Sequence, residues 1–356
     1  MIFFGQIGFY SDFFCSSGYD KRVMTIYPQN NPTQDSASLS SVTSLPQWGL
    51  ILVSGADAES FLQNQLTNSV VGLSLTPPSN IAYGNQGVRL VGYCNVKGRL
   101  LASAWIASYQ LPDSTESYFG LFLSKDIAAS FAKRLSMYVL RSKVSVKDVS
   151  DQWTISGYYS SPEQASNLVL NTEDFGLRLP NVLMDGKAQS RVLIAQRIEN
   201  QAGTFSEKDF LCWNNLEVLS AIPRIVLATQ EQFVPQMINF ESVAGIDFKK
   251  GCFPGQEIVA RSQYRGVIKR RLQLAHIEGS FDPQAFAPGV ELFHRDDPSQ
   301  PAGMVVLSAP NPQKSNWVDF QIECKLDALE HGEIHIGSST GPVLKIDSLP
   351  YPLIEI

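Results

Sequence analysis

The stretch "KKGCFPGQEIVARSQYRG", residues 249–266, joins a tight-turn signal to a helix signal and decides how the rest of the chain is interpreted. Pro254 and Gly255 suit the second and third positions of a type II turn, because proline fixes φ and glycine accepts positive φ. The residues that follow the turn predict a helix. Its first turn holds Glu257, where a carboxylate complements the helix dipole, and Gly266 is a plausible stop.

Cys252 therefore stands between two lysines, Lys249 and Lys250, and the start of a helix. Ammonium groups and a helix N-terminus both favour the thiolate form, so the sequence predicts a reactive thiol. The alternative is a small buried cysteine beside solvated lysines. Cys252 and Lys250 are our candidate functional residues in this turn, but the local pattern does not name a reaction.

Composition and charge narrow the class of protein. The chain has 356 residues, of which 44% are hydrophobic and 17% charged, which is typical of a globular protein with two or three domains. The net charge of −6 argues against a general nucleic-acid binder. Residues 249–271 nevertheless carry seven basic side chains and one acidic one, a local charge of +6. One basic strip thus lies on an otherwise acidic chain.

The five cysteines are widely separated and form no C-x-x-C pair, which suits a reducing compartment and gives neither a disulfide framework nor a metal or cluster site. No apolar run is long enough to span a membrane, and the start lacks the basic region of a signal peptide. We therefore expect a cytoplasmic protein without a membrane partner or a resident metal. Met24, which precedes a polar segment, is an alternative to Met1 as the start.

The chain divides into three parts by pattern. Residues 1–44 predict a flexible N-terminal segment, and 45–271 alternate between strands and helices in a way that favours an α+β fold. We expect helices capped by Ser54 and Ser124, a third after Pro162, and a fourth through "WNNLEVLSA", residues 213–221. Residues 272–356 show short strands with turn signals and no convincing helix, which favours a small β-barrel, closed or partly closed.

Three segments resemble one family. "GIDFKKGCFPGQEIVARSQYRG", residues 245–266, resembles the K-G-C-Y/F-x-G-Q-E signature of the YgfZ-type folate-binding proteins. These are relatives of the glycine-cleavage aminomethyltransferase and of a mitochondrial iron–sulfur assembly factor that works with folate. "WGLILVSGADAESFLQNQLTNSV", residues 48–70, looks like the first strand and helix of that family, and "YCNVKGRLLAS", residues 93–103, like its K-G-R segment. The resemblance covers most of residues 45–353, although Phe253 stands where tyrosine is more usual.

The resemblance implies two intertwined α+β domains around a central cavity for tetrahydrofolate, plus a C-terminal β-barrel. It implies an accessory role in the assembly or repair of iron–sulfur enzymes, including one that thiomethylates tRNA. The implied partners are folate and the iron–sulfur assembly factors or client enzymes. We expect tetrahydrofolate or another folate derivative as the cofactor.

The resemblance also implies binding residues. Two tryptophans implicated in folate binding fall on Trp48 and Trp213, and we expect Arg99, Gln256 and Glu257 of the K-G-R and K-G-C segments to bind the cofactor as well. Aromatic faces suit stacking on a pterin or aminobenzoyl ring. Without the resemblance, a tryptophan in a strand or helix would be interpreted as part of the core.

The main rival is an aminomethyltransferase-like enzyme that transfers a one-carbon group to folate. That enzyme uses an aspartate in a G-G-x-x-D-D-like segment, but here no acidic residue lies between Glu59 and Asp113. The segment instead holds Arg89, Lys97 and Arg99, which suit the carboxylates of folate or are ordinary surface bases. We therefore expect a helper without independent turnover; as an enzyme it would be a folate-dependent transferase.

Three roles stay open for Cys252: a transient iron or cluster ligand, a redox thiol, or a nucleophile. One thiolate cannot hold a cluster alone, so a ligand role needs a partner. We expect Cys252 to border the folate cavity. A second alternative is a tRNA-binding module that uses the basic strip for a weak contact, although we see no aromatic platform interleaved with that strip.

Overall fold

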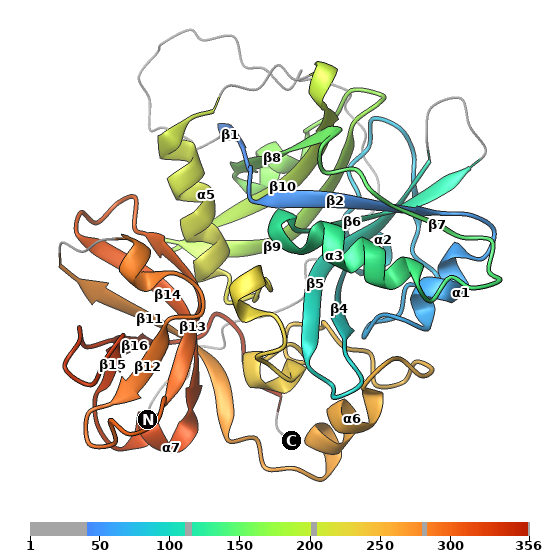
Figure 1. The fold of residues 1–356 in the computed structure, drawn as a ribbon. Helices are drawn as coiled ribbons and strands as arrows, with labels where there is room; N and C mark the ends of the chain where they lie inside the picture. Colours follow the sequence, from blue (N-terminus) through green and yellow to red (C-terminus); the bar gives the residue numbers. More distant parts are fainter. Residues whose placement is uncertain (1–40, 111–115, 201–204, 280–282, 355–356) are drawn as a thin grey trace, which may run out of the picture.

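The computed structural model describes residues 41–110, 116–200, 205–279 and 283–354. Its elements form three β-sheets with helices between and around them (Figure 1). This mixed, largely antiparallel architecture agrees with the expected α+β class. The division into two intertwined domains and the boundary at residue 271 stay predictions.

The first sheet is built around the apolar strand that begins at Trp48. Its strand order is β3-β5-β6-β2-β7, with β4 paired to β5, and all pairs are antiparallel except β3 with β5. The strands are β2 (Trp48–Ser54), β3 (Leu75–Thr76), β4 (Arg89–Cys94), β5 (Leu100–Gln110), β6 (Ser117–Ser124) and β7 (Ser145–Asp148).

The second sheet has the order β1-β8-β10-β9. Its strands are β1 (Ser41–Ser44), β8 (Trp153–Ser160), β9 (Phe175–Met184) and β10 (Lys187–Arg197). The expected flexible segment 1–44 is wrong for its last four residues, since Val42 and Thr43 suit a strand and pair with β8. Residues 1–40 lie outside the described residues.

The third sheet has the order β15-β12-β13-β14-β11-β16 and is curled into a half-barrel. Its strands are β11 (Arg270–Glu278), β12 (Glu291–His294), β13 (Gly303–Pro310), β14 (Trp317–Lys325), β15 (Ile334–Ile336) and β16 (Lys345–Asp347). Of the closed and partly closed barrels that the sequence left open, the structure shows the partly closed form, because the short edge strands β15 and β16 do not pair with each other in the described residues. The expectation of no convincing helix in this part is wrong at one place, since one turn of helix, α7 (Leu326–Glu330), follows β14.

The helices connect and cover the sheets. They are α1 (Ala58–Gln63), α2 (Gly84–Gly87), α3 (Lys125–Ser136), α4 (Pro162–Ser166), α5 (Glu207–Leu219), α6 (Gln256–Tyr264) and α7, with 3-10 turns η1 (Ile198–Asn200), η2 (Leu227–Thr229), η3 (Pro235–Ile238) and η4 (Pro283–Phe286). In the described residues no helix combines the length and the apolar character that a membrane span requires.

Two expected helix caps are used differently. Helix α1 begins at Ala58, and the carboxylate of Asp57 accepts from the backbone N–H of Lys143 (2.7 Å) instead of closing a capping box with Ser54. Ser124 does occupy the N-cap position of α3, but its hydroxyl donates to the carbonyl of Ile225 (2.7 Å). The side chains of Asp57 and Ser124 therefore bond to residues far away in the sequence instead of capping their helices.

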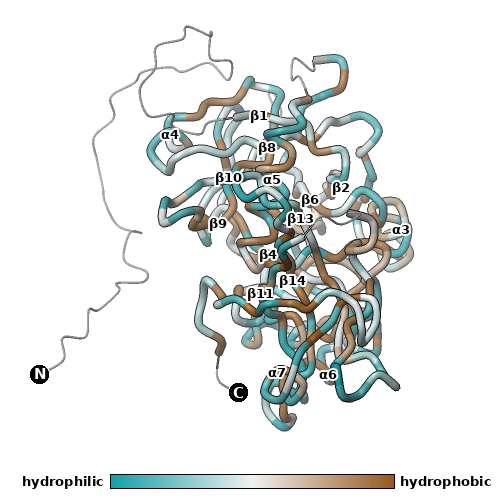
Figure 2. The backbone as a smooth tube through the Cα atoms, turned by 90° about the vertical axis from the view of Figure 1, so that its left-hand side faces the viewer, coloured by the Kyte–Doolittle hydropathy of each residue, from teal (hydrophilic) through white to brown (hydrophobic). Residues whose placement is uncertain are grey.

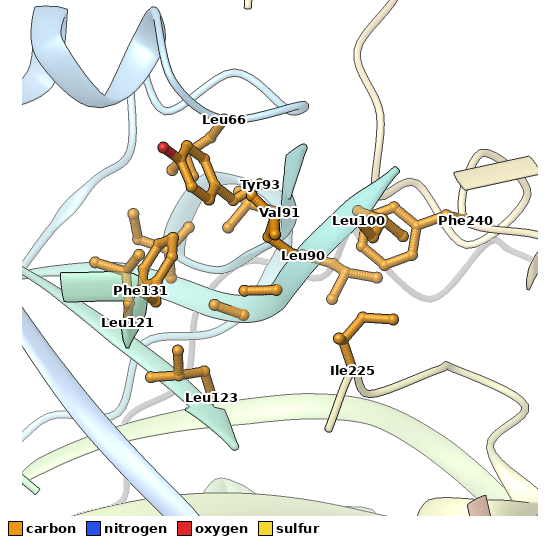
Figure 3. Close-up of a cluster of buried hydrophobic side chains, with 14 of the residues drawn as sticks. Leu66, Leu90, Val91, Tyr93, Leu100, Leu121, Leu123, Phe131, Ile225 and Phe240 are labelled. Atoms are coloured by element: carbon orange, nitrogen blue, oxygen red, sulfur yellow. The ribbon is translucent and has the colours of Figure 1, made fainter. Parts of the chain in front are cut away.

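The largest hydrophobic cluster lies between the first sheet, α1, α3 and the segment that follows α5 (Figure 3). Tyr93 meets Phe131 edge-on in this cluster, with ring centroids 5.1 Å apart. A second cluster joins the second sheet to α5 and contains both Trp48 and Trp213. Figure 2 shows hydrophobic stretches along strands of the sheets, and strand residues contribute many of the buried side chains of these clusters.

Helix α5 packs against strands of the second and third sheets. The amide of Gln321 in β14 donates to the carbonyls of Glu217 and Val218 (both 3.0 Å), which satisfies two groups at the C-terminal end of α5. Asn215 on the same helix donates to the carboxylate of Asp319 (2.6 Å). These buried bonds fix the position of Glu217.

Candidate functional site

The turn predicted around Pro254 is present. Gly255 has φ of 77° and ψ of 5°, and the backbone N–H of Gln256 donates to the carbonyl of Phe253 (3.1 Å), as in a type II turn. Helix α6 starts directly after it, as the sequence predicted. Gln256 is half-buried and Glu257 is exposed in the first turn of this helix.

The turn lies directly against the K-G-R segment, which forms the β4–β5 connection. A Cβ added at Gly255 would lie 2.3 Å from the carbonyl oxygen of Asn95 and 2.6 Å from the backbone of Gly98. Gly98 also has positive φ, 71°, and a Cβ there would lie 2.9 Å from Ile258 in α6. Two glycines thus allow two backbones to touch, and the two sequence motifs form one structural unit.

Lys250 is half-buried, and its ammonium has partners within the protein. The group donates to the carbonyls of Gln63 and Leu66, at the C-terminal end of α1, and lies 5.0 Å from the ring centroid of Phe253. Burial lowers the pKa of Lys250 to about 8, against the opposing charges of Asp247 and Cys252. Its position therefore ties the cysteine turn to α1, and a chemical role for it stays a prediction.

Cys252 is exposed, whereas Cys94, Cys212 and Cys324 are buried. Burial raises the pKa of the Cys94 and Cys324 thiols to about 12, so these two behave as small hydrophobic side chains. At the preceding residue, Gly251, an added Cβ would meet no atom within 4 Å outside its chain neighbours. The alternative of a buried filler cysteine is wrong for Cys252.

Arg99 is exposed but already has partners. Its guanidinium donates to the carbonyls of Glu231 (3.1 Å) and Gln232 (2.6 Å), in a segment whose backbone also hydrogen-bonds to Leu100 at the start of β5. This contact fixes the K-G-R turn against that segment. The predicted contact between Arg99 and folate remains a prediction.

The two tryptophans lie in different surroundings. Trp48, at the start of β2, lines a small inner cavity of about 20 Å³, and the guanidinium carbon of Arg224 lies 4.9 Å from its ring centroid. Trp213 on α5 is fully buried, and its ring packs against the backbone of Gly157 in β8. Trp213 lines neither this cavity nor the larger pocket beside it.

The inner cavity holds three charged side chains that sequence reasoning missed: Arg191, Glu217 and Arg224. Arg224 pairs with Glu217, with its Nε 2.5 Å from Oε1, and both side chains are nearly buried. Arg191 in β10 is 2% exposed, and its Nε has no hydrogen-bond partner in the described part of the chain. Burial lowers its pKa to about 10, against the opposing effect of Glu217. For these three residues, the sequence offered one signal of a buried charge: Arg191 stands inside the apolar strand pattern "SRVLIAQ".

A larger pocket of about 540 Å³ adjoins the inner cavity, because Glu217 and Arg224 line both. It lies between α5, the start of α3 and strand β13, and it also offers Gln47, Lys125 and Asn214. A pocket of this size suits a cofactor-sized ligand, and the buried ion pair forms its inner end.

Cys252 lines neither cavity, so the expected border between thiol and cavity is not found in either. Strand β5 connects the two places: its start follows the K-G-R turn, and Ser103, five residues beyond Gly98, lines the inner cavity. Five strand residues span roughly 17 Å. Within the described residues, no group of three or more histidine, cysteine, aspartate or glutamate side chains is placed to hold a metal ion.

Comparison with known proteins identifies relatives over most of the chain. An uncharacterized protein of Haemophilus influenzae is 31% identical over 318 residues, which cover 89% of this chain and 100% of that protein. The tRNA-modifying protein YgfZ of Photobacterium profundum is 31% identical over 263 residues, covering 70% of this chain and 74% of the relative. The protein of the same name from Sodalis glossinidius is 26% identical over 345 residues, covering 92% and 98%.

No known family profile matches the chain. Among solved structures, the glycine cleavage system aminomethyltransferase T of Bartonella henselae superposes with a TM-score of 0.53 over 88% of this chain and 86% of that one. The sequences are only 15% identical, so this likeness shows the fold alone. The fold, the joined K-G-R and K-G-C motifs and these relatives together show that the chain belongs to the family of the tRNA-modifying protein YgfZ.

Proposed function

We propose that this protein binds tetrahydrofolate and, as an accessory protein without independent turnover, supports the assembly or repair of iron–sulfur enzymes that include tRNA-thiomethylating ones. The observation that carries the folate part is the pair of adjoining cavities that meet at Glu217 and Arg224. Family membership supports the tRNA-modification part. In this proposal the protein acts in the cytoplasm, where thiols stay reduced.

The residues around the cavities fit a folate. A pterin edge carries both hydrogen-bond donors and acceptors. Glu217 would accept from the donors and Arg224 would donate to the acceptors, since both side chains line the larger pocket, whereas the inner cavity of about 20 Å³ beside Arg191 and Trp48 is too small for a pterin ring. Lys125, in the larger pocket, would meet a carboxylate of the glutamate tail. Folate supplies one-carbon or redox chemistry when it is bound, and these side chains bind and orient it.

In this proposal the exposed Cys252 faces a partner protein rather than the folate. The open space beside Gly251 leaves room for a partner to approach the thiol. A second candidate function, aminomethyl transfer to folate, is favoured by the fold of its solved relative. Against this second function, the K-G-R hairpin of this chain has no carboxylate, and its charged side chains are Arg89, Lys97 and Arg99. Aminomethyl transfer by the purified protein in a reconstituted glycine-cleavage assay would establish this second function.

Folate binding is tested by titrating tetrahydrofolate into the wild type and two variants, with tryptophan fluorescence as the readout. Glu217→Gln should bind at least about tenfold more weakly, because hydrogen bonds to charged groups contribute about 1.5–3 kcal/mol. Glu207→Gln, an exposed position on the same helix, is the matched control and should bind normally. Near-UV circular dichroism checks that both variants are folded. The folate proposal fails if the wild type shows no saturable binding or if the two variants bind equally well.

The thiol is tested in a deletion strain. The activity of a tRNA-thiomethylating iron–sulfur enzyme should recover with the wild-type gene and fall short with Cys252→Ala. Equal recovery removes Cys252 from the mechanism without touching the folate proposal.

A further inference from the structure

The basic side chains of the strip, residues 249–271, divide into those that have partners within the protein and those that are exposed. Arg271 is buried and pairs with Glu241. Arg270 pairs with Glu323, with Nη1 and Oε1 3.0 Å apart.

The ammonium of Lys250 is bound to backbone carbonyls, as described above. Four basic residues remain exposed and form no ion pair with a described carboxylate: Lys249, Arg261, Arg265 and Lys269.

Helix α6 presents most of this charge. Only one of its residues, Val259, is buried, so the helix lies on the outside of the molecule, at its lower edge in Figure 1. Ile258, Arg261 and Arg265 follow each other at helical spacing on one exposed stripe. Because only Val259 of α6 packs into the core, most side chains of this helix are available at the surface of the protein.

Tyr264 lies within this charge as an aromatic platform. Its side chain is 70% exposed and is held edge-on by Phe248, with ring centroids 5.8 Å apart. Arg261 precedes it by three residues and Arg265 follows it directly. The interleaving of aromatic and basic side chains that the sequence analysis did not find is therefore present once the helix forms.

The neighbouring K-G-R turn extends the surface. The contact between Gly98 and Ile258 places Lys97 beside α6, and Val96 in the same turn is 77% exposed. We define the α6 surface as Lys97, Lys249, Arg261, Tyr264, Arg265 and Lys269. This surface holds five cations, and Glu257 is the one acidic residue of the strip 249–271, on a chain whose net charge is −6.

We propose that the α6 surface binds tRNA, with the basic side chains on phosphates and an unpaired base stacked on Tyr264. This goes beyond the proposed function, which needs no RNA contact. Single-stranded parts of RNA are bound by stacking on aromatic rings beside cations, and the remaining acidic surface disfavours other polyanion sites. An acidic protein partner would use the cations but has no need of an exposed ring that arginines flank.

Fluorescence anisotropy of labelled bulk tRNA tests the proposal. The double variant Arg261→Ala/Arg265→Ala should reduce the slope of log affinity against log salt by about 1.4–1.8, because each lost phosphate contact accounts for about 0.7–0.9. Tyr264→Ala should weaken binding by about five- to 150-fold and leave that slope unchanged, since one stacked base is lost. The control Lys187→Ala/Lys208→Ala removes the same charge from exposed sites elsewhere and should behave like the wild type.

Equal behaviour of the two double variants overturns the proposal, because binding would then follow net charge alone. It is also overturned if Tyr264→Ala binds tRNA normally while polyglutamate competes as well as tRNA, which would assign the surface to an acidic protein. All substituted side chains are exposed, so the variants should stay folded and retain tetrahydrofolate binding. Loss of tRNA binding with normal folate binding separates this proposal from the proposed function.

Discussion

The contact between the cysteine turn and the K-G-R turn is tested by Gly255→Ala. This substitution meets two obstacles at once. The residue has φ of 77°, where an L side chain costs about 1–2 kcal/mol, and the new Cβ would lie 2.3 Å from the carbonyl oxygen of Asn95. The atoms in its way are backbone atoms, which cannot rotate aside.

Overpacking of this kind costs about 1–3 kcal/mol, so the free energy of unfolding should fall by about 2–5 kcal/mol in total. Gly72→Ala is the matched control. Gly72 has φ of 74°, lies beside Val70 and Leu73 of the same hydrophobic cluster, and has no atom within 4 Å of an added Cβ. The free energy of unfolding of Gly72→Ala should fall only by the cost of positive φ for an L side chain, about 1–2 kcal/mol.

Urea unfolding monitored by tryptophan fluorescence measures both variants. A difference of about 2 kcal/mol separates the midpoints by about 0.7 M if the slope is about 3 kcal/mol per molar urea. Midpoints that agree within about 0.2 M would refute the reasoning, because the clash that distinguishes Gly255 from Gly72 would then be absent.

Two further predictions concern the same turn. Iodoacetamide at neutral pH should label Cys252 before Cys94, Cys212 and Cys324, because only Cys252 of these four is exposed, and peptide mass mapping that finds one of the others labelled first contradicts the exposure argument. The stability of the wild type relative to Lys250→Met should rise between about pH 8 and pH 10.5, since in that window the unfolded chain still binds the proton that folded Lys250 has lost. Urea midpoints of both proteins at pH 7.5 and pH 10 measure this, and a constant difference shows that burial does not lower the pKa of Lys250.

The local elements of this protein were determined by the sequence. Proline and glycine at 254 and 255 are enough to specify the turn, since each restricts or extends φ within its own residue. The periodic patterns around α3, α5 and α6 predicted those helices, because a helix needs only neighbours three and four residues away. The family signature was readable for the same reason: it is a short string of residues.

The site depended on contacts between distant residues, which only the tertiary structure decided. Arg191, Glu217 and Arg224 come from a strand, a helix and a loop, and nothing in their local sequence marks them as neighbours. The same holds for the approach of Gly98 to the cysteine turn and for the use of Lys250 as a cap on α1. The charge of the basic strip was visible in the sequence, but which of its members face solvent depends on carboxylates and carbonyls elsewhere in the chain. Burial and pairing are properties of packed elements, so composition alone cannot assign them.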